Sequence, residues 1–212
     1  MRGLAKAIQL QAARHPEYRM SKILIINGHS QRSGSPGRLS ATFVARADAF
    51  FEGKGFEINR THIDDDYSVE DEVEKLKWAD TVFLQFPINW LATPWALKKY
   101  IDEVWMLGLQ GHLSNGDGRV PEAPTRNYGL GGKLDSTYML SITGNAPREA
   151  FSNPEEKFFD GLSEDDLFRW LHLNFKWNGQ TQLPTFVAYD VMKNPQIERD
   201  FARFDAHLHE NF

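Results

Sequence analysis

The 212-residue sequence contains no cysteine. This absence excludes disulfide bonds, thiolate metal ligands and a cysteine nucleophile. Basic residues are in the minority, since 24 Lys and Arg stand against 29 Asp and Glu for a formal net charge of −5. A net negative charge disfavours non-specific binding of nucleic acid, and no nucleic-acid partner is expected. No apolar run approaches the roughly 20 residues needed to span a bilayer, so no membrane span is expected.

The composition is that of a folded domain. Hydrophobic residues make up 41% of the chain and charged residues 25%, which excludes a disordered or fibrous chain. A length of 212 residues corresponds to one domain that can bury a core without covalent cross-links.

Residues 1–19 differ in composition from the rest. They carry four basic residues against one acidic residue, Glu17, and lack the apolar segment of a secretory signal. A basic, acid-poor start also resembles a mitochondrial transit peptide, but Met20 runs directly into an apolar segment, as a natural start does. We therefore expect 1–19 to be a disordered tail or a mis-called start, and 20–212 to form the domain.

Short apolar runs alternate with amphipathic segments along residues 20–212. The runs predict buried strands, and apolar residues recurring every three or four positions predict helices between them. The expected strands are 23–26, 56–63, 81–86, 138–142 and 185–189. This alternation predicts an α/β protein with a doubly wound, five-stranded parallel sheet in the order 2-1-3-4-5 and helices on both faces.

Capping residues mark the expected helix starts. Ser35 is expected to cap a helix with Pro36 in its first position, and Ser163 to cap a single helix that continues to Phe175. Residues 105–135 fit no regular element. An irregular, glycine-rich connection of that length often signals a functional loop.

Ligands of doubly wound sheets bind outside the carboxyl ends of the strands, where the strand order reverses. This rule selects the loops after the first, third and fourth strands. The first loop, 28–35, is rich in serine and glycine and leads into a helix start, where backbone amides favour an anion. A capped helix after a loose loop is the alternative. The loop lacks both the Gly-x-Gly-x-x-Gly pattern and the lysine of a P-loop.

The second loop, 87–95, carries Ile, Leu and two Trp where polar turn residues are expected. A flat aromatic cofactor needs such a wall for stacking, and backbone amides for its edge. The alternative is that the tryptophans cap the core, which we favour for Trp95, whereas Trp90 fits the cofactor better. The third loop, 143–147, offers hydrogen-bond donors at the same rim.

Titratable residues have simpler interpretations. His29 lies in the first loop and can touch a phosphate, although an exposed loop histidine is the commoner case. His172 is expected to be a packed helix residue. The acidic residues 64–66 are expected to form a solvated turn, because they lack the ligand spacing of a calcium loop. No metal site is expected.

Ten short motifs occur in order along residues 20–212. They are Ile23-Leu-Ile-Ile-Asn-Gly28, Ser35-x-Gly37-x-Leu39-x-x-Thr42, Trp78-Ala-Asp80, Pro94-Trp95-x-x-Lys98-Lys-Tyr100-Ile-Asp102, Asp117-Gly-Arg119, Tyr128-Gly-x-Gly-Gly132, Tyr138-Met-Leu-Ser141, Asn145-Ala-Pro147, Glu149-Ala-Phe151 and Leu183-Pro-Thr-Phe186. Together they resemble the bacterial flavin-dependent NADPH:quinone reductases of the modulator-of-drug-activity-B type, within the flavodoxin-like superfamily. Each motif alone is weak, whereas the ordered set is specific.

The resemblance implies a cytoplasmic, FAD-containing homodimer that transfers two electrons from NADPH or NADH to a quinone by successive hydride transfers. In the family, the FAD phosphates are held by residues that correspond to Ser35, Pro36, Gly37, Arg38, Leu39, Ser40, Ala41 and Thr42. The isoalloxazine ring is flanked by residues that correspond to Pro87, Ile88, Asn89, Trp90, Thr143, Gly144, Asn145 and Ala146. Tyr128 corresponds to a tyrosine that lines the flavin site across the dimer, and is the candidate catalytic residue.

Two turns depart from the family pattern. The usual Pro-Gly-Trp-Trp reads Pro87-Ile88-Asn89-Trp90 here, and the usual Thr-Trp reads Thr143-Gly144. These changes remove two indole groups from the expected ring site and can widen its pocket. Flavin-dependent reduction of azo or nitro compounds, non-enzymatic electron transfer and a cofactor-free interaction module stay open as alternatives.

Overall fold

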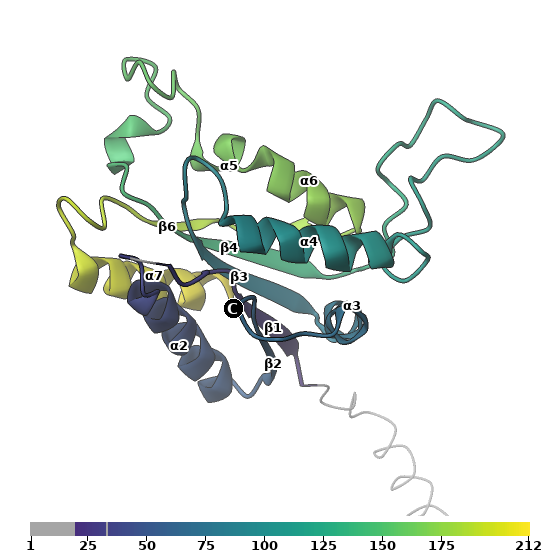
Figure 1. The fold of residues 1–212 in the computed structure, drawn as a ribbon, viewed down its shortest axis with the longest axis horizontal. Helices are drawn as coiled ribbons and strands as arrows, with labels where there is room; N and C mark the ends of the chain where they lie inside the picture. Colours follow the sequence, from purple (N-terminus) through teal and green to yellow (C-terminus); the bar gives the residue numbers. More distant parts are fainter. Residues whose placement is uncertain (1–19, 33) are drawn as a thin grey trace, which may run out of the picture.

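The structure, a computed structural model, describes residues 20–32 and 34–212. Its centre is a parallel sheet (Figure 1). The main path runs through β2 (Glu57–His62), β1 (Lys22–Asn27), β3 (Thr81–Pro87), β4 (Thr137–Thr143) and β5 (Thr181–Gln182), and β6 (Phe186–Ala188) also pairs with β4. The predicted α/β fold and strand order are confirmed. The tail expected for residues 1–19 lies outside the described residues.

The edge beside β4 differs from the prediction, because two short strands stand where one was expected. β5 pairs with the amino end of β4, and β6 pairs with its carboxyl end. The Leu183 amide donates to the Tyr138 carbonyl at 2.8 Å, but Pro184 has no amide hydrogen and interrupts the ladder. The expected strand 185–189 is therefore reduced to β6, and the sheet formed by the described residues has six strands.

Helices cover both faces of the sheet, as Figure 1 shows. The helices α2 (Arg38–Gly53) and α7 (Ile197–Asn211) pack on one face. The other face is covered by α3 (Val69–Trp78), α4 (Trp95–Gly108), the one-turn α5 (Glu164–Leu167) and α6 (Arg169–Trp177). A 3₁₀ turn, Arg148–Ala150, follows β4.

The two faces build two separate apolar cores from alternate residues of the same strands. In β1, Ile23 and Ile25 pack with Phe43 on the face covered by α2 and α7, whereas Leu24 and Ile26 join the core beneath α3 and α4. All four β1 side chains are at most 1% exposed. Burial on both faces explains why the strand is a continuous apolar run rather than an alternating one.

The helix expected from Ser163 to Phe175 is divided in two. Ser163 caps α5 as predicted, but the chain leaves helical geometry at Phe168, with φ −102° and ψ 19°. The Phe168 ring is fully buried and meets the ring of Phe86 edge-on, with centroids 5.1 Å apart. This tertiary contact accounts for the break, because continuing the helix would move the ring.

The irregular segment predicted at 105–135 begins later than expected, since α4 continues to Gly108. It returns to the amino ends of the strands, where the Leu134 amide donates to the Asn178 carbonyl at 2.8 Å and the Thr137 amide to the Asp80 carbonyl at 3.0 Å. Figure 1 shows the segment projecting beyond the end of α4, away from the loops that follow β1, β3 and β4. We refer to residues 109–136 as the insert.

Candidate functional site

The loops after β1, β3 and β4 meet at the carboxyl edge of the sheet, the edge formed by the carboxyl ends of the strands. Backbone hydrogen bonds continue the ladder beyond the strands: Gly28 donates to Gln85 at 2.7 Å, and Ile88 to Thr143 at 2.8 Å. The Gly144 amide extends the same pattern to Ala188 at 2.9 Å. The three loops selected from the sequence are thus adjacent in space.

The first loop ends in a helix start that no side chain caps. α2 begins at Arg38, so Pro36 precedes the helix, and the N-cap is Gly37 in the left-handed region with φ 76°. The prediction that Ser35 caps the helix is wrong, because its hydroxyl lies 3.3 Å from Nε2 of His29 instead. Within residues 20–32 and 34–212, no side chain caps the first amides of α2, which can bind an anion with the aid of the helix dipole.

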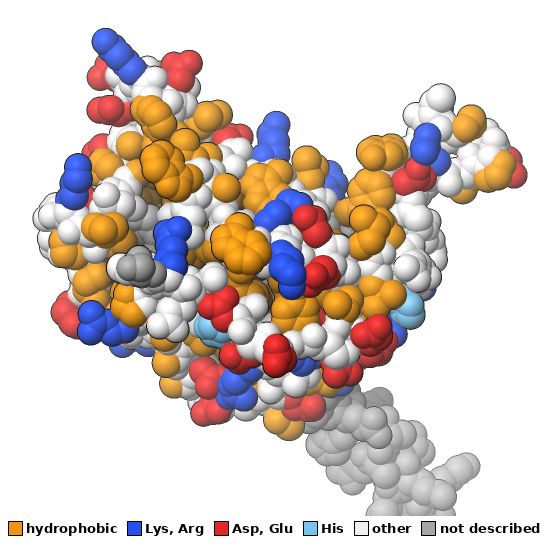
Figure 2. Space-filling view, in the orientation of Figure 1, with side chains coloured by type: hydrophobic (Ala, Val, Ile, Leu, Met, Phe, Trp, Pro, Cys, Tyr) orange, Lys and Arg blue, Asp and Glu red, His pale blue; other side chains and the backbone are white. Residues whose placement is uncertain are grey.

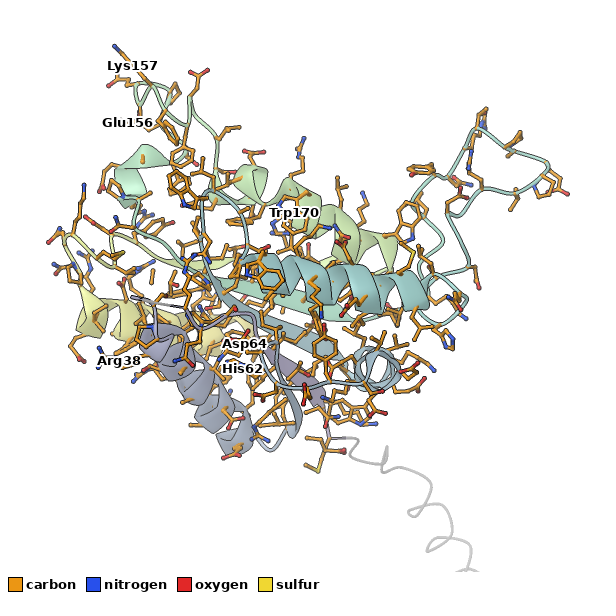
Figure 3. The ribbon with its side chains drawn as sticks, viewed as in Figure 1. Arg38, His62, Asp64, Glu156, Lys157 and Trp170 are labelled. Carbon is orange, nitrogen blue, oxygen red and sulfur yellow. The ribbon has the colours of Figure 1, made fainter. Side chains whose placement is uncertain are left out.

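Two hydrogen-bond donors of the expected phosphate-binding segment already bond to backbone carbonyls. The Ala41 amide donates to the Gly37 carbonyl at 2.9 Å, and the Thr42 hydroxyl donates to the Arg38 carbonyl at 2.9 Å. Ser40 is buried, at 3% exposure. Figure 3 shows Arg38 at the start of α2. The amides of Arg38, Leu39 and Ser40 are therefore the best placed donors of this segment.

His29 lies beneath the first loop and is buried, so its expected exposure is wrong. A Cβ at Gly37 would lie 2.5 Å from its Nδ1, which shows how closely the ring supports the helix start. Burial is the largest cause that lowers the pKa of His29. The ring is therefore neutral at pH 7. This support could not be predicted from sequence, because it depends on the path of the loop.

The first loop is also tied to the turn that follows β2. The Gln31 amide donates to Oδ2 of Asp64 at 2.6 Å. Partial burial opposes ionisation of Asp64, but this bond and one from Ser30 lower the pKa of its carboxyl below the usual range. Figure 3 shows Asp64 and His62 beside one another at the end of β2. One acid of the expected solvated turn thus has a structural role.

The second loop makes a tight turn that presents a tryptophan to solvent. Asn89 and Ala92 exchange backbone hydrogen bonds of 2.8 and 3.1 Å, while Trp90 and Leu91 adopt φ values of 48° and 63°. Such left-handed geometry is strained for bulky residues and is concentrated at functional sites. Trp90 is 96% exposed, and Trp95 is 75% exposed. The expectation that Trp95 caps the core is therefore wrong.

A cavity of about 400 Å³ opens between the second loop, the third loop and the segment 147–163. Its polar side includes Asn145 and the Arg32 guanidinium, which donates to Oδ1 of Asn89 at 2.5 Å. This hydrogen bond connects the first and second loops. The apolar lining residues are Ile88, Trp90, Leu91, Ala146, Phe151, Phe158, Phe159 and Leu167. The phenylalanines were not predicted as site residues.

The third loop passes close to the second at one point. A Cβ added at Gly144 would lie 2.9 Å from Cδ1 of Ile88, which is closer than ordinary packing allows. The Ala146 carbonyl accepts a hydrogen bond from the Asp190 amide at 3.1 Å. The loop is therefore fixed from both sides, and Ile88 occupies the space that a side chain at position 144 would need.

Tyr128 does not lie with these loops in the same chain. It belongs to the insert, is 68% exposed, and packs edge-on against the ring of Trp177 with centroids 5.2 Å apart. The Arg119 guanidinium lies 5.6 Å from its ring centre. The insert joins the amino ends of the strands, so Tyr128 cannot line the site of its own chain.

Apolar side chains gather on the face formed by α4, α6 and the base of the insert (Figure 2). Trp95, Met106 and Leu173 are between 57% and 75% exposed there. A second cavity of about 310 Å³ between α4 and α6 is lined by Trp105, Met106, Leu109 and Leu173 among others. An exposed apolar surface of this kind is typical of a protein–protein interface.

Other site types find no support in residues 20–32 and 34–212. Within these ranges, no group of three or more His, Asp and Glu side chains is placed to hold a metal ion. No helix there has the length and apolar character to cross a membrane.

Comparisons with known proteins agree with the fold. The family described as having a flavodoxin-like fold matches residues 21–211. The chain is 42% identical over 191 residues to the NADPH:quinone oxidoreductase MdaB of Haemophilus influenzae, covering 90% of this chain and 98% of that protein.

Solved structures share the architecture at lower identity. The NAD(P)H:quinone oxidoreductase from Methanothermobacter marburgensis superposes with a TM-score of 0.61 at 13% identity, covering 92% of this chain and 98% of that one. The general stress protein 14 of Treponema denticola, in complex with FMN, gives 0.58 at 18% identity, covering 92% and 100%.

His29 is expected to titrate below the ordinary histidine pKa of about 6.5, because its buried ring resists charging. Since the unfolded chain binds the proton more readily, the stability that His29 contributes is complete above that pH and declines as the pH falls. NMR titration of the ring signals measures the pKa, and their loss in His29→Gln identifies them. A pKa at or above 6.5 would contradict the burial argument.

Proposed function

The chain belongs to the flavodoxin-like fold family, together with the Haemophilus NADPH:quinone oxidoreductase, and on that basis we propose that it is a flavin-dependent reductase of quinones. In this proposal two electrons pass from NADPH or NADH to the quinone. The observation that carries it is the uncapped start of α2 beside a largely apolar cavity at the same edge of the sheet. The first suits phosphates, and the second suits a flat ring.

The residues at the start of α2 fit the phosphates of a flavin nucleotide. Gly37 leaves the first amides of α2 accessible to a phosphate. Its left-handed backbone and the nearby His29 ring leave no room for a side chain at this position. The amides of Arg38, Leu39 and Ser40 would bind the phosphate oxygens. We retain FAD as the cofactor from the family resemblance, and the whole segment 35–42 as its phosphate-binding segment.

The second and third loops fit the ring system. Ile88, Asn89 and Trp90 would flank it on one side, and residues 143–146 on the other. A bound flavin would supply the redox chemistry, namely hydride transfer between NAD(P)H and the acceptor. The protein needs only to hold the flavin against NAD(P)H or the acceptor, to exclude water and to offer backbone hydrogen-bond donors to the reduced ring. The site therefore requires no titrating catalytic pair.

We also propose a homodimer. The insert joins the amino ends of the strands, whereas the candidate flavin site lies at their carboxyl ends, so Tyr128 can line a flavin site only in another copy of the chain. The exposed apolar face of α4 and α6 lies at the base of the insert and gives two copies a surface to associate through. The expected cytoplasmic location stays a prediction.

The proposed function is tested with the purified protein. It should show the visible absorption of an oxidised flavin, and acid extraction followed by chromatography should identify FAD. NADPH should be consumed steadily with menadione as acceptor. A colourless protein that binds no added flavin would contradict the proposal, and faster turnover with an azo dye than with menadione would favour the alternative reductase.

Gly37→Val should release most of the bound flavin, because a branched side chain meets His29 and obstructs the helix amides. Gly34→Val is the matched control: Gly34 has a similar φ of 78°, but nothing lies within 4 Å of the added Cβ. Both variants carry a comparable left-handed strain of about 1–2 kcal/mol. Flavin content per chain is the measurement. Equal retention in both variants would remove the phosphate assignment.

Tyr128→Phe should reduce turnover about fivefold, which corresponds to one hydrogen bond of about 1 kcal/mol. The melting temperature should not change, because the substitution keeps the ring that packs against Trp177 and removes only the hydroxyl. Steady-state kinetics and thermal unfolding check the two expectations. Wild-type turnover together with wild-type flavin content would exclude the hydroxyl from the site.

A further inference from the structure

The cavity beside the second loop is lined both by the loops assigned to the ring and by residues outside those loops. It lies between the turn that carries Leu91 and the segment 147–163, and its volume of about 400 Å³ is within the range of small-molecule sites. Its outer wall consists of Phe151, Phe158, Phe159 and Leu167. None of these four residues is needed to hold a flavin by the loops assigned above.

The phenylalanines form an organised wall. Phe151 and Phe159 stack with ring centroids 4.4 Å apart and an interplanar angle of 22°, and both are at most 6% exposed. Phe158 meets Phe159 edge-on at 5.0 Å, but is 74% exposed. A large apolar side chain held at the mouth of a cavity is positioned to be covered by a ligand.

The backbone of this segment holds the wall in place. The Ser152 amide donates to the Leu162 carbonyl at 2.9 Å, and the Leu162 amide to the Phe159 carbonyl at 3.0 Å, which closes the loop at its base. Ser152 and Asp160 adopt φ values of 54° and 50°, a strained region for both. Figure 3 shows Glu156 and Lys157 at the outer tip of the segment, whereas the next two residues, Phe158 and Phe159, line the cavity.

Ile88 brings the second and third loops together at the cavity. Ile88 lines it and lies where a side chain at position 144 would have to be, with only 2.9 Å to an added Cβ. The polar lining residues are Arg32, Asn89 and Asn145, and the Arg32 guanidinium donates to Oδ1 of Asn89. A ligand group that lies against Phe151, Phe158, Phe159 and Leu167 would contact only carbon atoms of these side chains.

We propose that the outer part of this cavity binds an apolar chain carried by the electron acceptor, with Phe158 as a residue that determines specificity. The acceptor class is thus a quinone with an alkyl or isoprenoid substituent rather than a bare ring. This inference rests on the proposed quinone reductase activity. The alkyl or isoprenoid substituent contributes to binding only and does not change the redox step.

A series of quinones with one ring system and linear alkyl chains of increasing length tests the inference. Each methylene that enters the cavity should raise kcat/KM by up to about fourfold, until the cavity is filled and the values level off. In Phe158→Ser the dependence on chain length should flatten, and in Phe158→Leu it should largely return. Because Phe158 is exposed, neither substitution should change the melting temperature.

Met192→Ser is the matched control. Met192 is 78% exposed, close to the 74% of Phe158, but does not line the cavity. This variant should keep the wild-type dependence on chain length. Calorimetry with redox-inactive naphthalene derivatives carrying the same chains should show the same dependence in binding, independently of turnover.

The outcomes separate the inference from the function on which it rests. Reduction of the short-chain quinones with no gain from longer chains would overturn the inference and leave the proposed function standing. An equal chain-length dependence in the wild type and in Phe158→Ser would overturn the role of Phe158. Failure to reduce any member of the series would overturn both the inference and the proposed function.

Discussion

The arrangement of the site depends on hydrogen bonds that continue the sheet beyond its strands. The amides of Gly28, Ile88 and Gly144 each donate to a carbonyl of the neighbouring strand. The strand register therefore fixes how the three loops lie relative to one another. Within the sheet, the buried hydroxyl of Ser141 donates to Oε1 of Gln85 at 2.6 Å and joins β3 and β4 near the same edge. Ligands of such folds bind at this edge, beside the point between β1 and β3 where the strand order reverses.

Much of this frame could be predicted from the sequence, because buried parallel strands leave continuous apolar runs and helices leave a periodic stripe. The strand order and the three loops follow from those signals. Details that depend on contacts between distant residues could not be predicted. Phe168 breaks a helix by packing against Phe86, and Pro184 divides a strand. His29 is buried because of the path of its loop.

In the candidate site, too, features with a local sequence signal could be predicted, whereas those that depend on contacts between distant residues could not. The segment at the start of α2 and the aromatic turn were found from local composition, although Gly37 rather than Ser35 proved to be the N-cap. The phenylalanine wall was missed, because residues 147–163 have no period and their aromatic side chains meet only through the folded loop. Tyr128 was predicted from the family resemblance, and its place at the far edge of the sheet is the geometric reason for the proposed homodimer.

The most direct test of the account is a crystal structure of the protein with its flavin. The account predicts that the phosphates contact the amides of Arg38, Leu39 and Ser40, and that the ring lies between residues 87–90 and 143–146. It also predicts Tyr128 of a second copy at that ring. A flavin bound elsewhere, or these loops closed over one another by their own side chains, would contradict it.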